Sequence, residues 1–171
     1  MAKNKLKQNF YDKKATELAP QIVGKLLCVK TEDGTIKKLR ITETECYFGE
    51  EDTACHAHKG KTKRTAPLFE RGGIAYVYLC YGIHELFNVV TGAQNHPEAV
   101  LIRAVEGANG PGKATKALGI TRKFNTASLL GDEIWLEDDG YRPKTVAKPR
   151  VGIGYASKQD QERLWRFVAI I

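Results

Sequence analysis

The segment from Thr35 to Tyr47 constrains the fold most, because its side chains alternate as they do in one long β-strand. Successive side chains of a strand point to opposite faces of the sheet. One face, expected to point inward, then carries Leu39, Ile41, Glu43, Glu45 and Tyr47. Burying a carboxylate without a partner costs free energy. The pattern therefore predicts a basic group or a cleft at Glu43 and Glu45, unless this end of the strand emerges into solvent.

Other strand-like segments indicate that this strand belongs to an antiparallel sheet. They lie at residues 26–31, 74–81, 84–91, 99–105, 134–137, 150–153 and 164–170. The Asp33-Gly34 pair is typical of a tight hairpin turn. Tyr81-Gly82 is expected to form a second turn, with a tyrosine at or near its tip.

Helical segments are fewer and shorter than the strands. A helix is expected over residues 9–24, kinked or ended at Pro20. Pro111 is expected to open a short helix that ends near Ala117. Residues 48–71 read as a basic loop. The sequence thus predicts a single α+β domain across residues 1–171.

The charge balance favours a nucleic-acid partner. The net charge is +7 and the pI is about 9.2, which is the electrostatic footprint of many nucleic-acid-binding domains, although other basic proteins share it. Residues 1–10 are expected to form a mobile basic arm, either solvated or in contact with DNA. No apolar segment has the length of a secretory signal or approaches the roughly 20 residues that cross a bilayer. We therefore expect no membrane contact and an intracellular location, in the cytoplasm or nucleoid.

A small set of polar and aromatic residues suits chemistry on a nucleobase. An acid, Glu45, lies two residues from Tyr47, and Arg103 lies in an apolar strand. Tyr76 and Tyr78 alternate before the Tyr81 turn. An acid, an arginine and stacking aromatics in a basic setting are typical of water-driven attack on a base removed from its stack. Plainer interpretations stay open: a structural ion pair for Arg103, core packing for the tyrosines, and a surface position for His56 in the following loop.

Several ordered motifs then resemble the alkyladenine (3-methyladenine) DNA glycosylase family. They are Ile41–His56, Ala75–Gly82 followed by Asn88, Val100–Glu106, Asn109–Lys113 and Arg150–Gly154. The resemblance covers about residues 10–168. It implies a curved, mostly antiparallel sheet with flanking helices and a protruding β-hairpin that enters the DNA minor groove.

The resemblance also implies a role for each matching residue. Glu45 would activate the attacking water, with Arg103 and the Val151 carbonyl helping to hold that water. The flipped base would lie among Tyr47, His56 and Tyr78, and Asn88 would clash with the 2-amino group of guanine. Tyr81 would fill the gap in the duplex. The basic residues expected at the DNA backbone are Lys61, Lys63, Arg64 and Lys113.

These roles predict a monomeric enzyme that repairs damaged double-stranded DNA by hydrolysis. The candidate substrates are 3-methyladenine, 7-methylguanine, hypoxanthine and ethenoadenine. No lysine is among the residues matched to the flipped base or the attacking water, so none is placed to form a Schiff base. We therefore expect a monofunctional glycosylase that leaves an abasic site without lyase activity. Neither a metal nor a cofactor is expected. Arg103 is expected to hold the pKa of Glu45 down so that the base is ionised.

Three departures from the family pattern accompany the match. The segment Glu106–Asn109 is short where a longer insert is usual, the chain ends early at Ile171, and Thr65 stands where asparagine is more usual.

The sequence leaves three alternatives open. One is a catalytically decayed DNA-binding module of the same fold. Another is a zinc hydrolase built on Cys46, Cys55, His56 and His58, although the spacing is not a standard ligand pattern. The third, a formyltransferase-like binding domain, rests on fold analogy alone. The four cysteines form no Cys-x-x-Cys pair and are expected to be reduced.

Overall fold

The computed structural model describes residues 4–170 as one α+β domain. The helices are α1 (Gln8–Tyr11), α2 (Ala15–Ile22), α3 (Pro111–Leu118) and α4 (Lys158–Glu162), with short 3₁₀ turns η1 (His56–Lys59), η2 (Ala66–Phe69) and η3 (Arg122–Phe124). The strands are β1 (Leu26–Lys30), β2 (Ile36–Phe48), β3 (Ala75–Cys80), β4 (His84–Val90), β5 (Glu98–Val105), β6 (Ala108–Asn109), β7 (Ile134–Glu137), β8 (Thr145–Lys148) and β9 (Arg166–Ala169). Across this described part of the chain, every helix is too short or too polar to span a bilayer.

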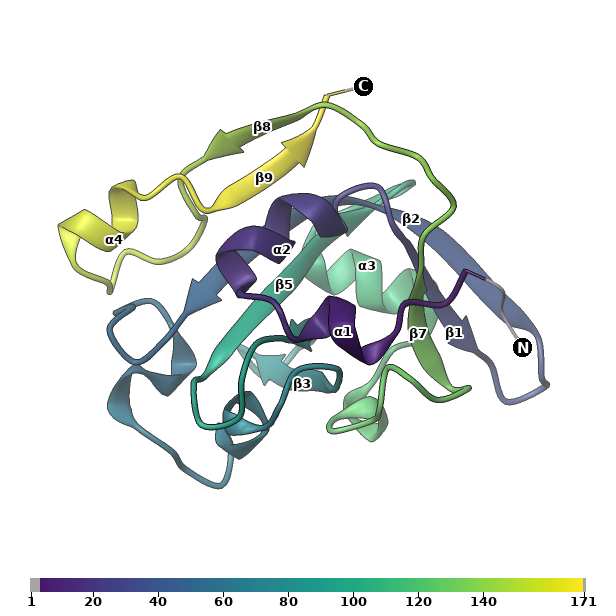
Figure 1. Cartoon of the computed structure of the whole chain (residues 1–171), viewed down its shortest axis with the longest axis horizontal. Helices are drawn as coiled ribbons and strands as arrows, with labels where there is room; N and C mark the ends of the chain where they lie inside the picture. Colours follow the sequence, from purple (N-terminus) through teal and green to yellow (C-terminus); the bar gives the residue numbers. More distant parts are fainter. Residues whose placement is uncertain (1–3, 171) are drawn as a thin grey trace.

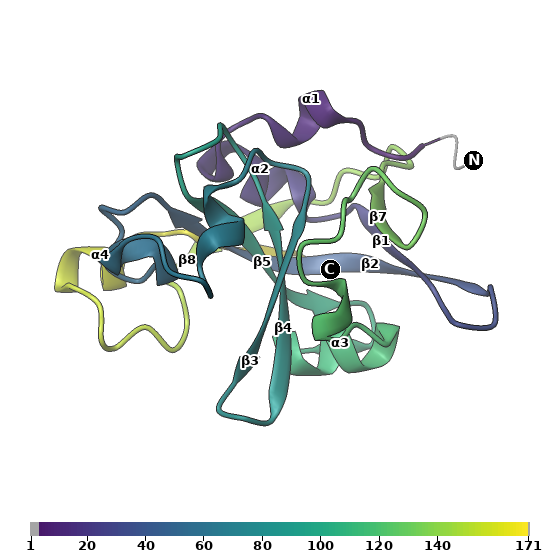
Figure 2. The same cartoon turned by 90° about the horizontal axis from the view of Figure 1, so that it is seen from below.

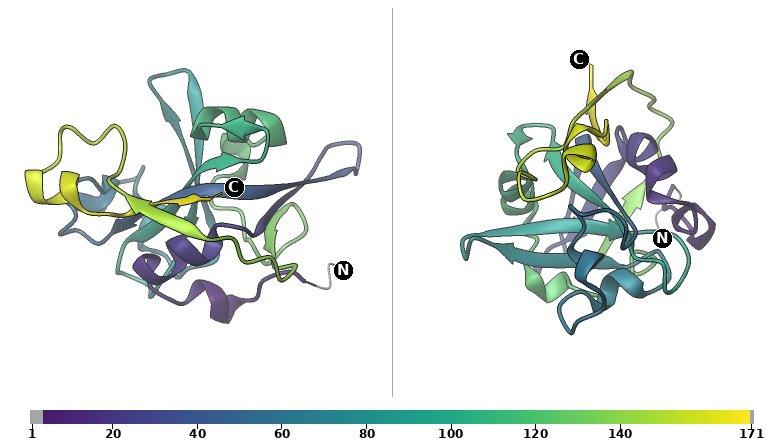
Figure 3. Two further views of the ribbon diagram at one scale, coloured as in Figure 1. Left: turned by 90° about the horizontal axis from the view of Figure 1, so that it is seen from above. Right: turned by 90° about the vertical axis from the view of Figure 1, so that its left-hand side faces the viewer.

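Strand β2 is the centre of a curled antiparallel sheet whose main order is β3-β4-β5-β2-β1-β7 (Figures 1 and 3). Its first half pairs with β1, and its second half pairs with β5. Strand β9 joins the opposite edge of that second half, at Glu43–Glu45. The segment that carries Glu43 and Glu45 is therefore held between two strands. The predicted antiparallel α+β fold is confirmed.

The sheet curls around one apolar core to which both longer helices contribute. Leu18 and Ile22 of α2 and Leu118 of α3 are fully buried in it. The hydroxyl of Thr44 on β2 donates to the Ala19 carbonyl, which ties α2 to the central strand. Helix α2 lies on the side of the domain away from the tip of the β3–β4 hairpin (Figure 2). The core thus supports β2 and β5 from one side and leaves the other side for the site.

The helix predicted over residues 9–24 is two helices, and the break is not at Pro20. The chain is extended at Lys14, and Glu98 accepts a hydrogen bond from the Ala15 N–H at 2.7 Å, which fixes the start of α2. Pro20 lies inside α2, close enough to its end that little helix remains to be disrupted. A buried acid far away in sequence, rather than the proline, decides where the helix begins.

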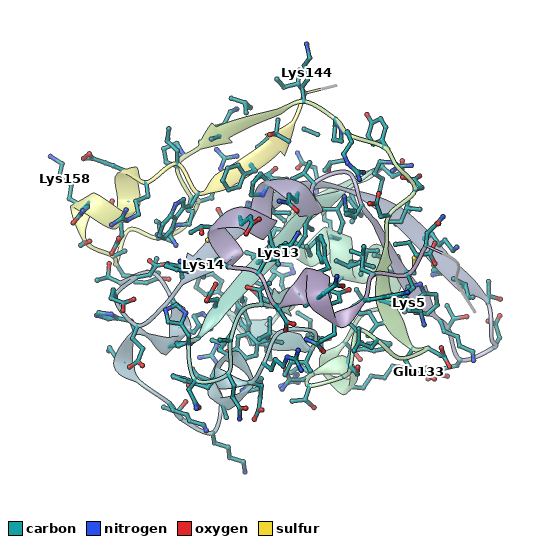
Figure 4. The ribbon with its side chains drawn as sticks, in the orientation of Figure 1. Lys5, Lys13, Lys14, Glu133, Lys144 and Lys158 are labelled. Carbon is teal, nitrogen blue, oxygen red and sulfur yellow. The ribbon has the colours of Figure 1, made fainter. Side chains whose placement is uncertain are left out.

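Residues 4–10, which belong to the predicted mobile basic arm, lie against the edge strand β7. The Leu6 N–H donates to the Leu136 carbonyl, and the Lys5 ammonium lies 4.8 Å from the centre of the Trp135 ring. Residues 1–3 of the expected arm lie outside the described residues. The later lysines Lys13 and Lys14 lie in the linker beside α1 and α2, on the side opposite the hairpin tip (Figures 2 and 4).

The strict alternation predicted along β2 fails near Glu43. Ile41 packs in the core with Cys46, whereas Glu45 and Tyr47 line a cavity on the other face. The cause is an irregular ladder: Ile41 pairs with Val105, and the register shifts on both sides of Glu43 before regular pairing resumes. Bulge-like irregularities re-aim side chains in this way. Leu39 and Ile41 therefore do not share a face with the two downstream residues.

The late part of the chain differs most from expectation. Residues 150–153 form a loop and not a strand, and the strand of this region is β8, which pairs with β9. Helix α4, with Ser157 as its N-cap, was not predicted. The segment from β8 to β9 runs along β2 (Figure 3) and brings Val151 to the site.

Candidate active site

A two-stranded hairpin, β3–β4, projects from the domain and presents Tyr81 at its tip (Figure 2). The Ile83 N–H donates to the Cys80 carbonyl and closes the turn. Tyr81 and Gly82 both have positive φ, 52° and 67°, a conformation that a bulky residue adopts only under strain. The Tyr81 side chain is 91% exposed. The turn therefore holds an aromatic ring out in solvent.

A cavity of about 700 Å³ lies beside this hairpin and is walled by β2, β3, β4, β5 and two loops. It brings together most of the residues that the sequence analysis singled out, namely Glu45, Tyr47, His56, Arg64, Tyr78, Tyr81, Asn88, Arg103 and Val151. Three expected DNA-backbone residues, Lys61, Lys63 and Lys113, do not line it. Lys61 lies 6.0 Å from the centre of the Phe69 ring, and Lys113 is exposed on α3.

Glu45 has no solvent-exposed surface and is held at both carboxylate oxygens. The Tyr47 hydroxyl donates to Oε1 at 2.7 Å. The Val151 N–H donates to Oε2 at 2.7 Å, across a wide separation in sequence. The carboxylate is thus fixed in one orientation at the wall of the cavity.

Burial raises the pKa of Glu45 above its ordinary value, even though Arg103, the Val151 N–H and the Tyr47 hydroxyl each act to lower it. Arg103 therefore lowers this pKa as expected, but it does not offset the effect of burial. Arg103 lies 3.9 Å from Glu45 but makes its shorter contact, 3.1 Å, with Glu43. Because Arg103 lies closer to Glu43 than to Glu45, its effect on the pKa of Glu45 is smaller than the opposite effect of burial.

Glu43 has the basic partners that the strand pattern predicted. Its Oε2 accepts from Arg103 Nε and from Arg166 Nη1, each at 3.1 Å. Arg166 lies on β9, opposite Glu45 in the strand register. The two acids of β2 thus have different environments. Glu43 is paired with two arginines, and Glu45 faces the cavity.

Aromatic rings form the cavity wall opposite the acid. The His56 and Tyr78 ring centres are 4.4 Å apart, and those of Tyr76 and Tyr78 are 5.4 Å apart. The Tyr76 hydroxyl lies 3.1 Å from His56 Nδ1 and orients that ring, and Asn88 Nδ2 donates to the Tyr76 carbonyl at 3.2 Å. Burial lowers the pKa of His56 to about 4. The imidazole is therefore neutral at neutral pH and does not repel a cation beside it.

Arg64, which is expected at the DNA backbone, lies over the aromatic wall. Its guanidinium carbon is 5.4 Å from the centre of the Tyr78 ring. Lys63, from the same loop, lines a second cavity of about 600 Å³ on the far side of η2. The predicted basic segment is thus divided between two faces.

Sequence reasoning did not single out three residues that support this site. Tyr155 lines the cavity, and its hydroxyl donates to the Ala54 carbonyl at 2.9 Å. Arg150 and Asp52 form a buried ion pair at 2.7 Å behind Tyr47. Arg150 and Asp52 lie inside the quoted motifs, so the motif itself was the available signal.

The side chains of the zinc alternative are not assembled into a site. His58 Nδ1 contacts the Glu50 carbonyl at 2.6 Å, and His56 Nδ1 contacts Tyr76. Within residues 4–170, no three His, Cys, Asp or Glu side chains are grouped to hold a metal ion. The thiols of Cys46 and Cys55 are buried, and burial raises their pKa.

The sequence matches known proteins over nearly its whole length. The family model described as "Methylpurine-DNA glycosylase (MPG)" matches residues 9–108 and 106–170. A protein of Chlamydia abortus is 42% identical over 173 residues, covering 88% of this chain and 90% of its own. One of Methanocella arvoryzae is 42% identical over 183 residues (95% and 90%), and one of Myxococcus xanthus is 43% identical over 175 residues (95% and 90%). Each of the three carries the name "Putative 3-methyladenine DNA glycosylase".

The raised pKa of Glu45 predicts that its charge destabilises the fold. Because the folded protein binds this proton more tightly than the unfolded chain does, the free energy of unfolding falls as pH rises from about 4.5 through the folded-state pKa. Glu45→Gln, which keeps the shape and removes the charge, should therefore raise stability at pH 7.5 and have little effect at pH 4. Urea unfolding at both pH values measures this. A variant less stable than wild type at pH 7.5 would contradict it.

Proposed function

The chain belongs to the methylpurine-DNA glycosylase family, and from this premise we propose that it flips alkylated or deaminated purines out of duplex DNA and hydrolyses their N-glycosidic bond. The observation that carries the proposal is the buried Glu45 carboxylate, held at both oxygens on the wall of an aromatic cavity. The product is an abasic site. The candidate bases are 3-methyladenine, 7-methylguanine, hypoxanthine and ethenoadenine.

The hairpin supports a flipping step. Removing a base from the stack costs a few kcal/mol, and an inserted side chain offsets part of that cost. Tyr81 is exposed and rigidly presented by its turn, so it suits the position vacated by the base. In this proposal the hairpin enters the minor groove and the damaged nucleotide enters the adjacent cavity.

The cavity suits an electron-poor purine. Its aromatic rings, Tyr47 and Tyr78 with the neutral His56, attract a positively charged ring through cation–π interaction. Asn88 is buried at the cavity wall, where its amide would meet a 2-amino group. The pocket thus favours alkylated purines over normal guanine.

Glu45 acts as the general base in this mechanism. It takes a proton from water, the water oxygen attacks C1′ of the sugar, and the C1′–N bond breaks with its electron pair leaving on the purine. Arg103 and the Val151 carbonyl help to hold the water. A cationic purine leaves as a neutral base, so one positioned general base suffices. Neither a metal nor a cofactor has a role in this step.

A catalytically decayed DNA-binding module is the alternative. Binding alone gives no reason to keep a carboxylate that is costly to bury and fixed by two donors. That cost favours catalysis.

Base release from defined lesions tests the proposal. Wild-type protein should release free base from duplexes that carry ethenoadenine or hypoxanthine, or from methylated DNA, without added metal. Glu45→Gln should lower the single-turnover rate by about 10²- to 10⁴-fold while DNA binding survives. Chromatography of the free base measures both. DNA binding with no release from any substrate would favour the decayed module.

The rate of base release should depend on pH through Glu45. Because the ionised form is active and burial raises its pKa, the acidic limb should have its midpoint above 4.5, with activity lost as pH falls. Arg103→Met should move that limb to higher pH, because a cation that lowers the pKa of Glu45 is removed. Single-turnover rates between pH 4 and pH 9 measure the midpoint. A limb at or below 4.5 in wild type would contradict the assignment.

Hydrolysis without a Schiff base is the third expectation. Among the described residues, Lys59 is the lysine that lines the cavity, and it is exposed on η1. With Glu45 as the activator of water, the abasic strand should remain intact until it is treated with hot alkali. Borohydride should trap no protein–DNA adduct. A trapped adduct would show lyase chemistry and make Lys59 the first residue to examine.

A further inference from the structure

We propose that Arg150 is a positioning residue for Glu45, because it fixes both groups that donate hydrogen bonds to that carboxylate. This inference rests on the proposed function, in which Glu45 is the general base. Arg150 does not itself line the cavity. It acts through Tyr47 and Val151.

The Arg150 guanidinium is buried and held by several hydrogen bonds. Its side chain has no solvent exposure. Nη1 lies 2.7 Å from Asp52 Oδ2, and Nη2 lies 3.0 Å from Asp52 Oδ1, a bidentate pair. The same two nitrogens donate to the carbonyls of Cys46, at 2.9 Å, and Asp160, at 3.3 Å. The guanidinium therefore has one orientation.

The first consequence falls on Tyr47. The guanidinium carbon of Arg150 lies 5.0 Å from the centre of the Tyr47 ring, and on another side 5.0 Å from that of Trp165. The Cys46 carbonyl that Arg150 holds belongs to the peptide between Cys46 and Tyr47. Ring and backbone of Tyr47 are thus both fixed, and with them the hydroxyl that donates to Glu45 Oε1.

The second consequence falls on Val151. This residue follows Arg150 directly and lies in a loop without strand pairing, with its side chain about half exposed. Its N–H donates to Glu45 Oε2 at 2.7 Å, and the loop is also held at Pro149, whose carbonyl accepts from Arg166 Nε at 2.8 Å. The buried Arg150 anchors the loop at the adjacent residue. Both oxygens of Glu45 are therefore held through one guanidinium.

Asp52 extends the same connection to the base-stacking wall. It accepts hydrogen bonds from the Phe48 N–H and the Ala54 N–H, both at 3.0 Å. Ala54 lies two residues before His56 in the loop that stacks on Tyr78. The ion pair thus sets the general base and the loop of the aromatic wall relative to each other.

The pKa of Glu45 gives a readout other than stability, because it depends on the charged and polar groups that face this carboxylate. They are Arg103 from β5 and Arg150 from the loop after β8, with the Tyr47 hydroxyl on β2. Glu43 pairs with both Arg103 and Arg166. Removing Arg150 takes away one cation that lowers the pKa of Glu45 and loosens both donors. Loss of the Arg150 charge alone raises that pKa, so the discriminating variant is Asp52→Asn, which keeps the Arg150 charge and removes a nearby anion: a pKa that still rises there reports the loosened donors.

The test compares Arg150→Met and the nearly isosteric Asp52→Asn with a matched control, Arg163→Met. Arg163 stacks on the same Trp165 ring, at 4.9 Å, and pairs with Asp160, at 2.9 Å, but makes no contact with Tyr47 or Glu45. Single-turnover base release, affinity for a duplex with a stable abasic-site analogue, and circular dichroism are measured for each variant. Titration of the Glu45 carboxyl by NMR gives a readout that needs no activity.

If Arg150 positions Glu45, then Arg150→Met and Asp52→Asn fold, bind the duplex within about twofold of wild type, and lose about 10- to 100-fold in release rate. Their Glu45 pKa rises, and Arg163→Met matches wild type. Arg150→Lys, which keeps the charge but not the bidentate pair, recovers the pKa more than the rate. If Arg150→Met does not fold, Asp52→Asn and the titration decide.

A folded Arg150→Met or Asp52→Asn variant with the wild-type rate and the wild-type Glu45 pKa overturns the inference. Equal losses in Arg163→Met would do the same, because they would show a general packing effect. Absence of base release in wild type is a separate result, since it refutes the proposed function. In that case an unchanged Glu45 pKa in Asp52→Asn would still overturn the positioning role, and a raised one would support it.

Discussion

A carboxylate without solvent contact, Glu45, is the constraint on which the rest of the site depends. Burying a charge in a protein interior costs several kcal/mol unless hydrogen bonds and opposite charges offset it. Here two short hydrogen bonds and two nearby arginines offset the cost only in part, because the net effect of the surroundings is to raise the pKa. A fold selected for stability alone would place an apolar residue at this position. Under the proposed function, the role of Glu45 as general base accounts for this incomplete compensation.

The sheet provides the two conditions that such a residue needs. Strand pairing of β2 with both β5 and β9 fixes the backbone at Glu43–Glu45. The irregular ladder near Glu43 turns Glu45 and Tyr47 away from the core and toward the cavity. The core then keeps Ile41 and Cys46 dry on the opposite face. The same irregularity in the register around Glu43 that breaks the simple alternation thus separates the core-facing residues of this strand from those that line the cavity.

Most elements of the fold could be predicted from short segments of sequence, because hairpin turns and strand alternation depend on neighbouring residues. The Asp33-Gly34 turn, the β3–β4 hairpin and the short helix from Pro111 lie where their residues predicted. The start of α2 could not be predicted, because Glu98, distant in sequence, caps it. The ladder shift at Glu43 depends on two strands together. For the site, the motifs identified the residues that meet in the cavity. Their spacing in the sequence could not predict which side chains contact each other. Arg103 lies closer to Glu43 than to Glu45, and Arg64 lies over the Tyr78 ring.

The short connection after β5 shows how a family departure can leave the site intact. Glu106 and Gly107 form a tight turn, with Gly107 at φ 81°, and Ala108–Asn109 folds back onto the end of β5. Pro111 then opens α3 at once, and α3 still buries Leu118 in the core. The two hydrogen-bond donors to Glu45 are the Tyr47 hydroxyl on β2 and the Val151 N–H in the loop after β8. Neither donor belongs to this turn. The turn bears on the cavity only through Pro111, at its wall. A shorter connection here can therefore change how the pocket is closed without changing how its acid is held.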